Sequence, residues 1–67
     1  MTQITTREKE ILRHFCHGLT SKEVAKECHI SIHTVDSHRK RLYRKLDVRT
    51  GVQLGAKAIS QNLIDLD

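Results

Sequence analysis

Residues 31–46 of this 67-residue chain combine hydroxyl, imidazole and basic side chains at spacings that suit contact with nucleic acid. When the segment is drawn as a helix, advancing about 100° per residue, four polar side chains share one face. They are His33, Ser37, Lys40 and Arg44. Short polar groups come first and long cations follow. This order is typical of a helix whose first half enters the DNA major groove while its later turns lie against phosphates.

The opposite face of the same helix is apolar. It carries Val35, Leu42 and Leu46, with Ile32 close by. Arg41 and Asp36 flank the polar face on its two sides. If the apolar side chains point into the protein interior, the polar face must point outward. The sequence therefore predicts a basic recognition surface on a helix that packs against a core.

The composition fits a polyanionic partner for such a surface. Twelve Lys and Arg residues against eight Asp and Glu residues give a net charge of +4. The length allows one small domain, which we expect to span residues 1–67. No apolar run approaches the ~18 residues of a membrane span, and no secretory signal is visible. Cys16 and Cys28 fall on apolar stripes, so we interpret them as small buried hydrophobes and expect a cytoplasmic protein.

Apolar side chains recur at helical spacing throughout the chain, whereas Val, Ile and Thr never alternate over the length of a strand, so we expect an all-α fold. Four helices are expected, at residues 6–17, 21–28, 32–46 and 51–63. Thr5 and Glu8 have the spacing of a capping box, in which each side chain satisfies a free backbone donor at the helix start. Thr20 and Glu23 repeat this spacing. Gly18 is expected to end the first helix, because glycine enters the left-handed region easily.

The second and third expected helices have the register of a helix-turn-helix. Ala25 supplies the small residue that is needed where the two helices cross closely, and apolar neighbours hold them together. They are Val24, Cys28, Ile30 and Val35. His29 takes the place of the usual glycine in the turn, and histidine is among the non-glycine residues enriched at positive φ.

The motifs along the chain resemble those of the LuxR-type helix-turn-helix domain, also called the FixJ or GerE type, of bacterial response regulators and quorum sensors. The first motif is Ile4, Thr5, Arg7, Glu8, Glu10, Ile11 and Leu12. The second is Gly18, Leu19, Thr20, Ser21, Lys22, Glu23, Val24 and Ala25. The third is Ile30, Ser31, Thr34, Val35, His38, Lys45, Leu46 and Val48. The resemblance extends from Ile4 to about Ile64. It implies a four-helix LuxR-type domain that binds DNA sequence-specifically, without a cofactor, as the effector part of a bacterial transcriptional regulator.

The resemblance also implies which residues contact DNA. Base contacts are expected from Asp36, Ser37 and Lys40. Phosphate contacts are expected from Thr20, Ser21, Lys22, Thr34, Arg41 and Arg44. Physical chemistry supports the residues of the second helix independently, because the free amides at a helix N-terminus attract phosphate.

Relatives in this family pair into dimers through their fourth helix. The expected inner stripe of that helix is Val52, Ala56, Ile59 and Leu63. Leu54 and Ala58 lie opposite this stripe, so we expect them to be exposed and to form the interface of a weak homodimer. Such a dimer predicts a double-stranded DNA site made of two half-sites related by two-fold symmetry. The resemblance also allows RNA polymerase as a further partner.

Five residues depart from the family pattern: Asp36, Arg41, Gly51, Leu54 and Gly55. Asp36 stands where many relatives present lysine to the bases. Two interpretations stay open: its carboxylate accepts a hydrogen bond from a cytosine N4 or adenine N6 amino group, or it pairs with Lys40, four residues on. Gly51 and Gly55 replace the more usual Arg and Val, and each glycine weakens the fourth helix by roughly 1 kcal/mol relative to alanine.

Other chemistries are poorly supported, and we expect neither an enzyme nor a metal site. The His and Cys side chains of the first helix do not converge on one face, and Cys28 with His29 lacks a second matched pair for zinc. No Ser–His–acid or Cys–His arrangement can be argued from the sequence. His38 is interpreted as a partly buried structural or phosphate-facing group.

Two alternative functions stay open. Region 4 of a sigma factor shares the Thr-x-Arg-Glu start and a similar helix-turn-helix, and it would bind promoter DNA while docked on polymerase. The Lys-Leu-x-Val ending and the fourth helix favour the LuxR type instead. A protein-interaction helical domain without DNA binding is the second alternative, and Asp36 and the glycines of the fourth helix are its best support.

Overall fold

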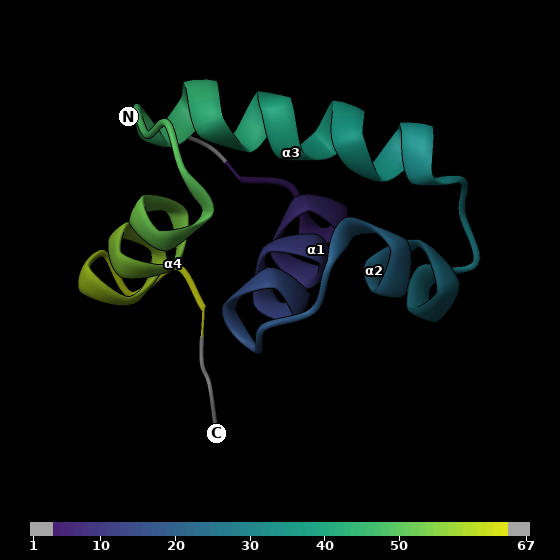
Figure 1. Cartoon of the computed structure of the whole chain (residues 1–67). Coiled ribbons are helices and arrows are strands. Elements are labelled where there is room, and N and C mark those ends of the chain that lie inside the picture. The colour runs from purple at the N-terminus through teal and green to yellow at the C-terminus, as the bar shows by residue number, and fades with distance from the viewer. Residues whose placement is uncertain (1–3, 65–67) are drawn as a thin grey trace.

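The structure is a computed structural model that describes residues 4–64, and four helices make up most of that range (Figure 1). They are α1 (Thr6–Cys16), α2 (Ser21–Cys28), α3 (Ile32–Leu46) and α4 (Gly51–Ser60). The described part contains no strand, so the expected all-α fold is confirmed. The expected domain, residues 1–67, also includes residues 1–3 and 65–67, which lie outside the described part.

Local sequence determines where the helices begin. The Thr5 hydroxyl accepts a hydrogen bond from the Glu8 backbone N–H at 3.1 Å, and the Glu8 carboxylate accepts one from the Thr5 N–H at 3.0 Å. Thr20 and Glu23 make the same exchange, at 3.2 and 2.9 Å, at the start of α2. Both predicted capping boxes are therefore confirmed, and each satisfies two backbone donors that have no partner within the helix.

Residues in the left-handed conformation follow the first three helices. Gly18 has a φ of +90° after α1, and His29 has a φ of 56° in the turn between α2 and α3, both as predicted. Asp47 also adopts the left-handed conformation, with a φ of 55°, directly after α3. α4 ends at Ser60 instead of the expected residue 63, because Asn62 turns the chain at a φ of 54°.

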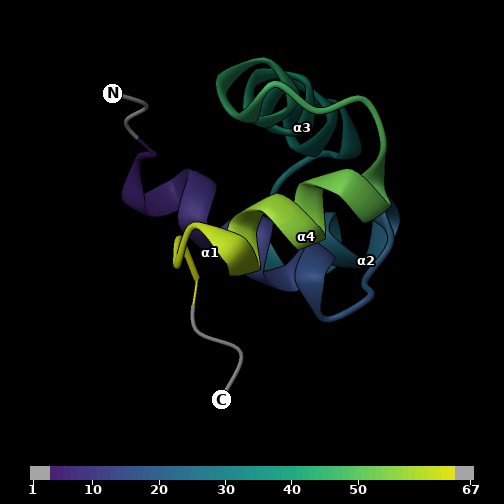
Figure 2. The same ribbon diagram turned by 90° about the vertical axis from the view of Figure 1, so that its left-hand side faces the viewer.

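α3 lies across one side of the other three helices, as Figure 1 and Figure 2 show from two directions. The helices enclose a small core of apolar side chains that are buried or nearly so. They are Ile11, Leu12, Val24, Ala25, Val35, Leu42, Leu46, Leu54 and Ala58. Burial of one Leu, Ile or Val side chain stabilises a fold by about 1.5–3 kcal/mol. The three core residues that α3 contributes therefore hold this helix at a fixed rotation.

A buried ion pair ties α3 to the start of α1. Glu8 is fully buried, and Lys45 Nζ donates a hydrogen bond to its Oε1 at 2.6 Å. Burial by itself would raise the pKa of Glu8, but hydrogen bonds from Lys45 and Thr5 outweigh burial and hold the pKa below its usual value of 4.5. Glu8 is therefore ionised in the folded protein at neutral pH, and its charge stabilises the docking of α3.

α4 turns the opposite face to the core from the one expected. Leu54 is 1% exposed and Ala58 is 0% exposed. Val52 of the expected inner stripe is 85% exposed, and Ile59 is 51% exposed. The predicted dimer interface at Leu54 and Ala58 is therefore wrong, because both side chains belong to the core.

The core contacts of α4 explain this orientation. Leu54 and Ala58, four residues apart on one face, pack into the cluster formed with α1, α2 and α3. Gly55 lies between the buried and the exposed sides of α4, and a Cβ placed on it would stand 3.9 Å from Cys16 Sγ of α1, an ordinary contact distance. The larger Val52 and Ile59 are left outside the core.

Candidate nucleic-acid interface

The buried side chains of α3 determine which of its residues face outward. Val35 and Leu42 are 0% exposed, and Leu46 is 2% exposed. The polar residues on the opposite side are all exposed. They are His33, Ser37, Lys40, Arg41 and Arg44. The predicted orientation of α3 is therefore confirmed, and the helix presents short polar groups followed by long cationic ones.

The first turn of α3 adds hydroxyl groups and one apolar side chain to this surface. Ser31 Oγ accepts a hydrogen bond from the Thr34 N–H at 3.1 Å and lies 2.9 Å from Thr34 Oγ1. Thr34 is exposed, as a phosphate contact requires. Ile32 is 42% exposed, although its spacing placed it close to the apolar side. The exposed Ile32 side chain therefore adds an apolar group at the N-terminal end of α3, the part with which a recognition helix contacts base edges.

Asp36 pairs with Arg39 and not with Lys40. Its Oδ1 lies 3.4 Å from Arg39 Nη2, and both side chains are 38% exposed. Lys40 points outward and makes no ion pair with another residue in the range 4–64. The interpretation of Asp36 as the partner of Lys40 is therefore wrong, whereas a contact of Asp36 with a base stays a prediction.

Arg39 and Tyr43 belong to this surface, and sequence reasoning missed both. Arg39 Cζ lies 6.0 Å from the centre of the Tyr43 ring, at a distance typical of a cation–π contact. Both residues stand on the border between the buried and outward faces of α3, so the division of the helix into an apolar and a polar face left them out. The spacing of Asp36, Arg39 and Tyr43 at i, i+3 and i+7 could have revealed their contact, because it places the three on one flank.

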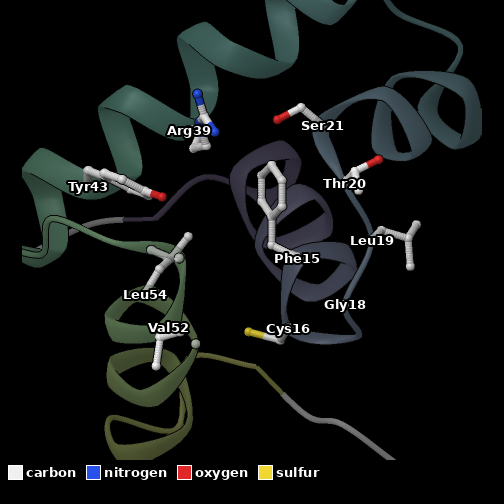
Figure 3. A pocket seen from close by; sticks show the side chains of 12 residues that line it. Phe15, Cys16, Gly18, Leu19, Thr20, Ser21, Arg39, Tyr43, Val52 and Leu54 are labelled. Atoms are coloured by element: carbon white, nitrogen blue, oxygen red, sulfur yellow. The ribbon is translucent and has the colours of Figure 1, made fainter.

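An open groove of about 610 Å³ lies beside this flank of α3 (Figure 3). Arg39 and Tyr43 line it from α3, Ser21 lines it from the first turn of α2, and Gly51 lines it from the start of α4. Figure 3 shows the Ser21 and Tyr43 hydroxyls on two sides of the space next to Arg39. The groove therefore connects the flank of α3 with the part of α2 that was predicted to contact phosphate.

The predicted phosphate contacts of α2 stand at its start. Thr20 and Lys22 are exposed, and Ser21 is half-buried. The Thr20 hydroxyl already accepts a hydrogen bond from the Glu23 N–H. The Ser21 hydroxyl makes no hydrogen bond with another described residue, so it is available to a ligand.

Other groups capable of chemistry are dispersed. Within residues 4–64, no three His, Cys, Asp or Glu side chains stand close enough to hold one metal ion. Cys16 and Cys28 are free thiols that pack against the core, and burial raises the pKa of Cys16 above its usual 9.0. The Cys16 thiol is therefore protonated and weakly nucleophilic at neutral pH. His38 is half-buried, and its Nδ1 has no hydrogen-bond partner in the described part. None of the helices described is long and apolar enough to cross a membrane.

Known proteins share both the sequence pattern and the fold of this chain. The family model described as bacterial regulatory proteins, luxR family, matches residues 2–62. The uncharacterized response regulatory protein YgeK of Escherichia coli (strain K12) is 44% identical over 52 residues, which are 78% of this chain and 35% of that protein.

Two solved structures resemble the four-helix arrangement closely. The response regulator ChrA of a heme-sensing two-component system matches with a TM-score of 0.91 and 33% identity, over 96% of this chain and 32% of that one. The VqmA dimer of Vibrio cholerae, a LuxR-type receptor, matches with a TM-score of 0.87 and 28% identity, over 91% of this chain and 28% of that one. The chain thus spans about a third of the length of these relatives, and its fold is that of LuxR-type helix-turn-helix regulators.

Proposed function

The chain belongs to the luxR family of bacterial regulatory proteins and is the DNA-binding domain of a transcriptional regulator; starting from this membership, we propose that it reads a specific operator with α3 in the major groove. We also propose that the domain is the effector part of a longer response regulator or quorum-sensing-type regulator that acts in the bacterial cytoplasm. The share of each relative that the chain covers supports this second proposal.

The proposal rests on the rotation of α3 about its own axis, which determines the side chains that face outward. Burial of Val35 and Leu42 leaves the outward face free for DNA. The 15 residues of α3 extend about 22 Å at roughly 1.5 Å per residue. The first turns of the helix can therefore enter the groove while Arg44, near its end, remains beside the backbone.

The residues divide into two groups by their position along α3 and at the start of α2. Ser37 and Lys40 are proposed to contact base edges, where the Lys40 ammonium suits the O6 and N7 acceptors of guanine. The remaining polar residues are proposed to contact phosphates and so to hold the helix in register. They are Thr20, Ser21, Lys22, Thr34, Arg41 and Arg44.

A second copy of the chain is a proposed partner through the outer side of α4. Val52 is 85% exposed and Ile59 is 51% exposed, and Ala56 between them is exposed as well. No other described residue buries this apolar stripe, so it is open to a second copy. The dimeric state named for VqmA supports pairing, and a two-fold pair of half-sites is the operator that a symmetric dimer would bind.

A salt series on DNA binding tests the proposal. Affinity should fall steeply as salt rises, because each phosphate contact contributes about −0.9 to the slope of log K against log salt. The control is Lys9→Ala, which removes an exposed cation of α1 that lies beside Leu63 and Ile64. This variant should bind with nearly the same slope. Failure to bind any duplex at low salt would refute DNA binding and favour a protein-interaction domain.

A further inference from the structure

We propose that Arg39, Tyr43 and Ser21 form a binding site for one phosphate of the DNA backbone, and that Asp36 positions Arg39 in this site instead of making the base contact that the family resemblance predicted. The inference rests on the proposed DNA binding and adds a contact outside the outward face of α3. The inference rests on two features. The Arg39 guanidinium is contacted on two sides and keeps N–H donors that no described residue uses. The hydroxyls of Tyr43 and Ser21 stand in the same groove without hydrogen-bond partners among the described residues.

Arg39 is held by its neighbours on α3 and still keeps most of its donors. Asp36 Oδ1 lies 3.4 Å from its Nη2, and the Tyr43 ring centre lies 6.0 Å from its Cζ. A guanidinium has five N–H donors in a planar fork, so one carboxylate oxygen occupies few of them. Arg39 donates no hydrogen bond to a described residue, and Asp36 meets it through the ion pair alone. A guanidinium that is already fixed loses less side-chain entropy when it binds a phosphate.

Two hydroxyls stand in the groove with Arg39. Tyr43 contributes one from α3 and Ser21 contributes the other from α2 (Figure 3). Neither hydroxyl makes a hydrogen bond within residues 4–64. Gly51 leaves Tyr43 uncovered, because even a Cβ at this position would lie 3.8 Å from Tyr43 Oη and a longer side chain would crowd it. Arg, Ser and Tyr side chains are among the usual donors to DNA phosphates.

The location of the groove favours a backbone phosphate over a free anion. The groove borders the flank of the proposed recognition helix and the first turn of α2, which are both proposed to lie against DNA. A free anion would meet one cation, Arg39, with the Asp36 carboxylate beside it. A phosphate within DNA is held by the neighbouring contacts as well, including those of Lys22 and Arg44, so the site needs to supply only part of the binding free energy.

The same geometry gives Asp36 its positioning role. Its carboxylate lies against Arg39 on the flank of α3, and this ion pair competes with a contact to a base amino group. The paired guanidinium also offsets the negative charge that Asp36 would otherwise bring near DNA. Asp36 therefore contributes through Arg39, and its effect should depend on Arg39 being present.

Binding of an operator duplex and a scrambled duplex over a salt series tests the phosphate site. Arg39→Ala should reduce the magnitude of the salt slope by about 0.9 and weaken binding to both duplexes alike. Tyr43→Phe, which removes only the hydroxyl, should weaken binding by roughly five- to tenfold. Circular dichroism spectra equal to wild type establish that these variants fold. Lys9→Ala, the matched loss of one cation, should leave the slope nearly unchanged.

Three possible results of the salt series would contradict different parts of the proposal. A slope unchanged by Arg39→Ala would overturn the phosphate site while leaving DNA binding in place. A wild-type chain that binds no duplex would refute the proposed function itself. An affinity unchanged by Tyr43→Phe would remove the hydroxyl from the site and overturn the proposed set of three donors.

Asp36→Ala in two backgrounds tests the positioning role. With Arg39→Ala already present, loss of a carboxylate from a DNA-facing helix should raise affinity. With Arg39 intact, the gain should be smaller by at least about threefold, or become a loss, because the guanidinium is released. Base preferences selected from random duplexes should be the same for Asp36→Ala and wild type. Equal gains in both backgrounds, or a changed preference at one base position, would overturn the positioning role.

Discussion

At the scale of single residues, the role of a charged side chain follows from the part of the helix on which it stands. Lys40 and Arg44 are both exposed on the outward face of α3, one turn apart. Lys40 is closer to the N-terminal half, which is proposed to meet base edges, and Arg44 is near the end that is proposed to meet phosphates. Asp36 and Arg39 stand on the flank and pair with each other, which a helical projection does not reveal.

Lys40→Ala and Arg44→Ala should therefore have different effects. Lys40→Ala should relax the preference at one base position and cost about 1–3 kcal/mol on the preferred operator, if Lys40 binds guanine. Arg44→Ala should weaken binding to all sequences similarly and reduce the salt slope by about 0.9. Dissociation constants for the operator and a scrambled duplex measure both effects. Equal and uniform losses for the two variants would show that Lys40 reads no base.

Glu8 makes the stability of the fold depend on pH. Because its pKa is lowered in the folded protein, its ionised form stabilises fully above the usual value of 4.5, and this contribution is lost as the pH falls through the lowered pKa. Glu8→Gln should lower the free energy of unfolding by about 2 kcal/mol near neutral pH, and by less in acid. Urea unfolding at the two pH values measures the difference.

The control for this prediction is Glu10→Gln on the same helix. Glu10 forms an exposed pair with Arg7 at 3.0 Å, and such pairs contribute at most about 1 kcal/mol. Its replacement should therefore have a small effect. If Glu8→Gln destabilised the fold equally at neutral and acidic pH, its ionised carboxylate would not be the stabilising species.

At the scale of helices, the features governed by local interactions were predictable from the sequence. Thr5 and Thr20 cap α1 and α2 as their spacing to Glu8 and Glu23 indicated, because a capping box involves residues only three positions apart. The left-handed turn at His29 was predictable for the same reason. The rotation of α3 followed because its large apolar residues concentrate on one face.

The orientation of α4 was not predictable in the same way. Its apolar residues occur on two sides, with Leu54 and Ala58 on one and Val52 and Ile59 on the other. Periodicity alone cannot decide which side is buried. The packing of Leu54 and Ala58 into the core decides it, and those contacts join residues far apart in the sequence. The pairing of Asp36 with Arg39 was missed for a related reason, because i+3 and i+4 partners are both within reach on a helix.

Gly55→Ala should raise the free energy of unfolding by up to about 1 kcal/mol, because alanine favours the helix. The added Cβ would lie 3.9 Å from the Cys16 sulfur, which is an ordinary contact distance. Gly18→Ala is the contrasting variant: at a φ of +90°, it should destabilise the fold by about 1–2 kcal/mol. Thermal unfolding of both variants tests whether the first stabilises the fold and the second destabilises it. A destabilised Gly55→Ala would mean that α4 packs on α1 without room for a methyl group.

At the scale of the whole molecule, one side of α4 belongs to the core and the opposite side is the proposed dimer surface. Ile59→Lys should leave stability and binding to a single half-site nearly unchanged, and should abolish cooperative binding to two half-sites. Leu54→Ala should instead lower the free energy of unfolding by about 2–5 kcal/mol, because this side chain is 1% exposed. Gel-shift titrations on one and two half-sites, together with unfolding curves, separate the two effects. Cooperativity that survives Ile59→Lys would place the dimer contact elsewhere.

Selection of bound duplexes from a random-sequence pool tests most directly that the outward face of α3 reads DNA. The wild-type chain should enrich inverted half-sites about one helical turn apart, and selection with Lys40→Ala should lose the preference at one position of each half-site. A pool that remains random although the wild-type chain binds it at low salt would contradict the account, because α3 would then contact only the backbone.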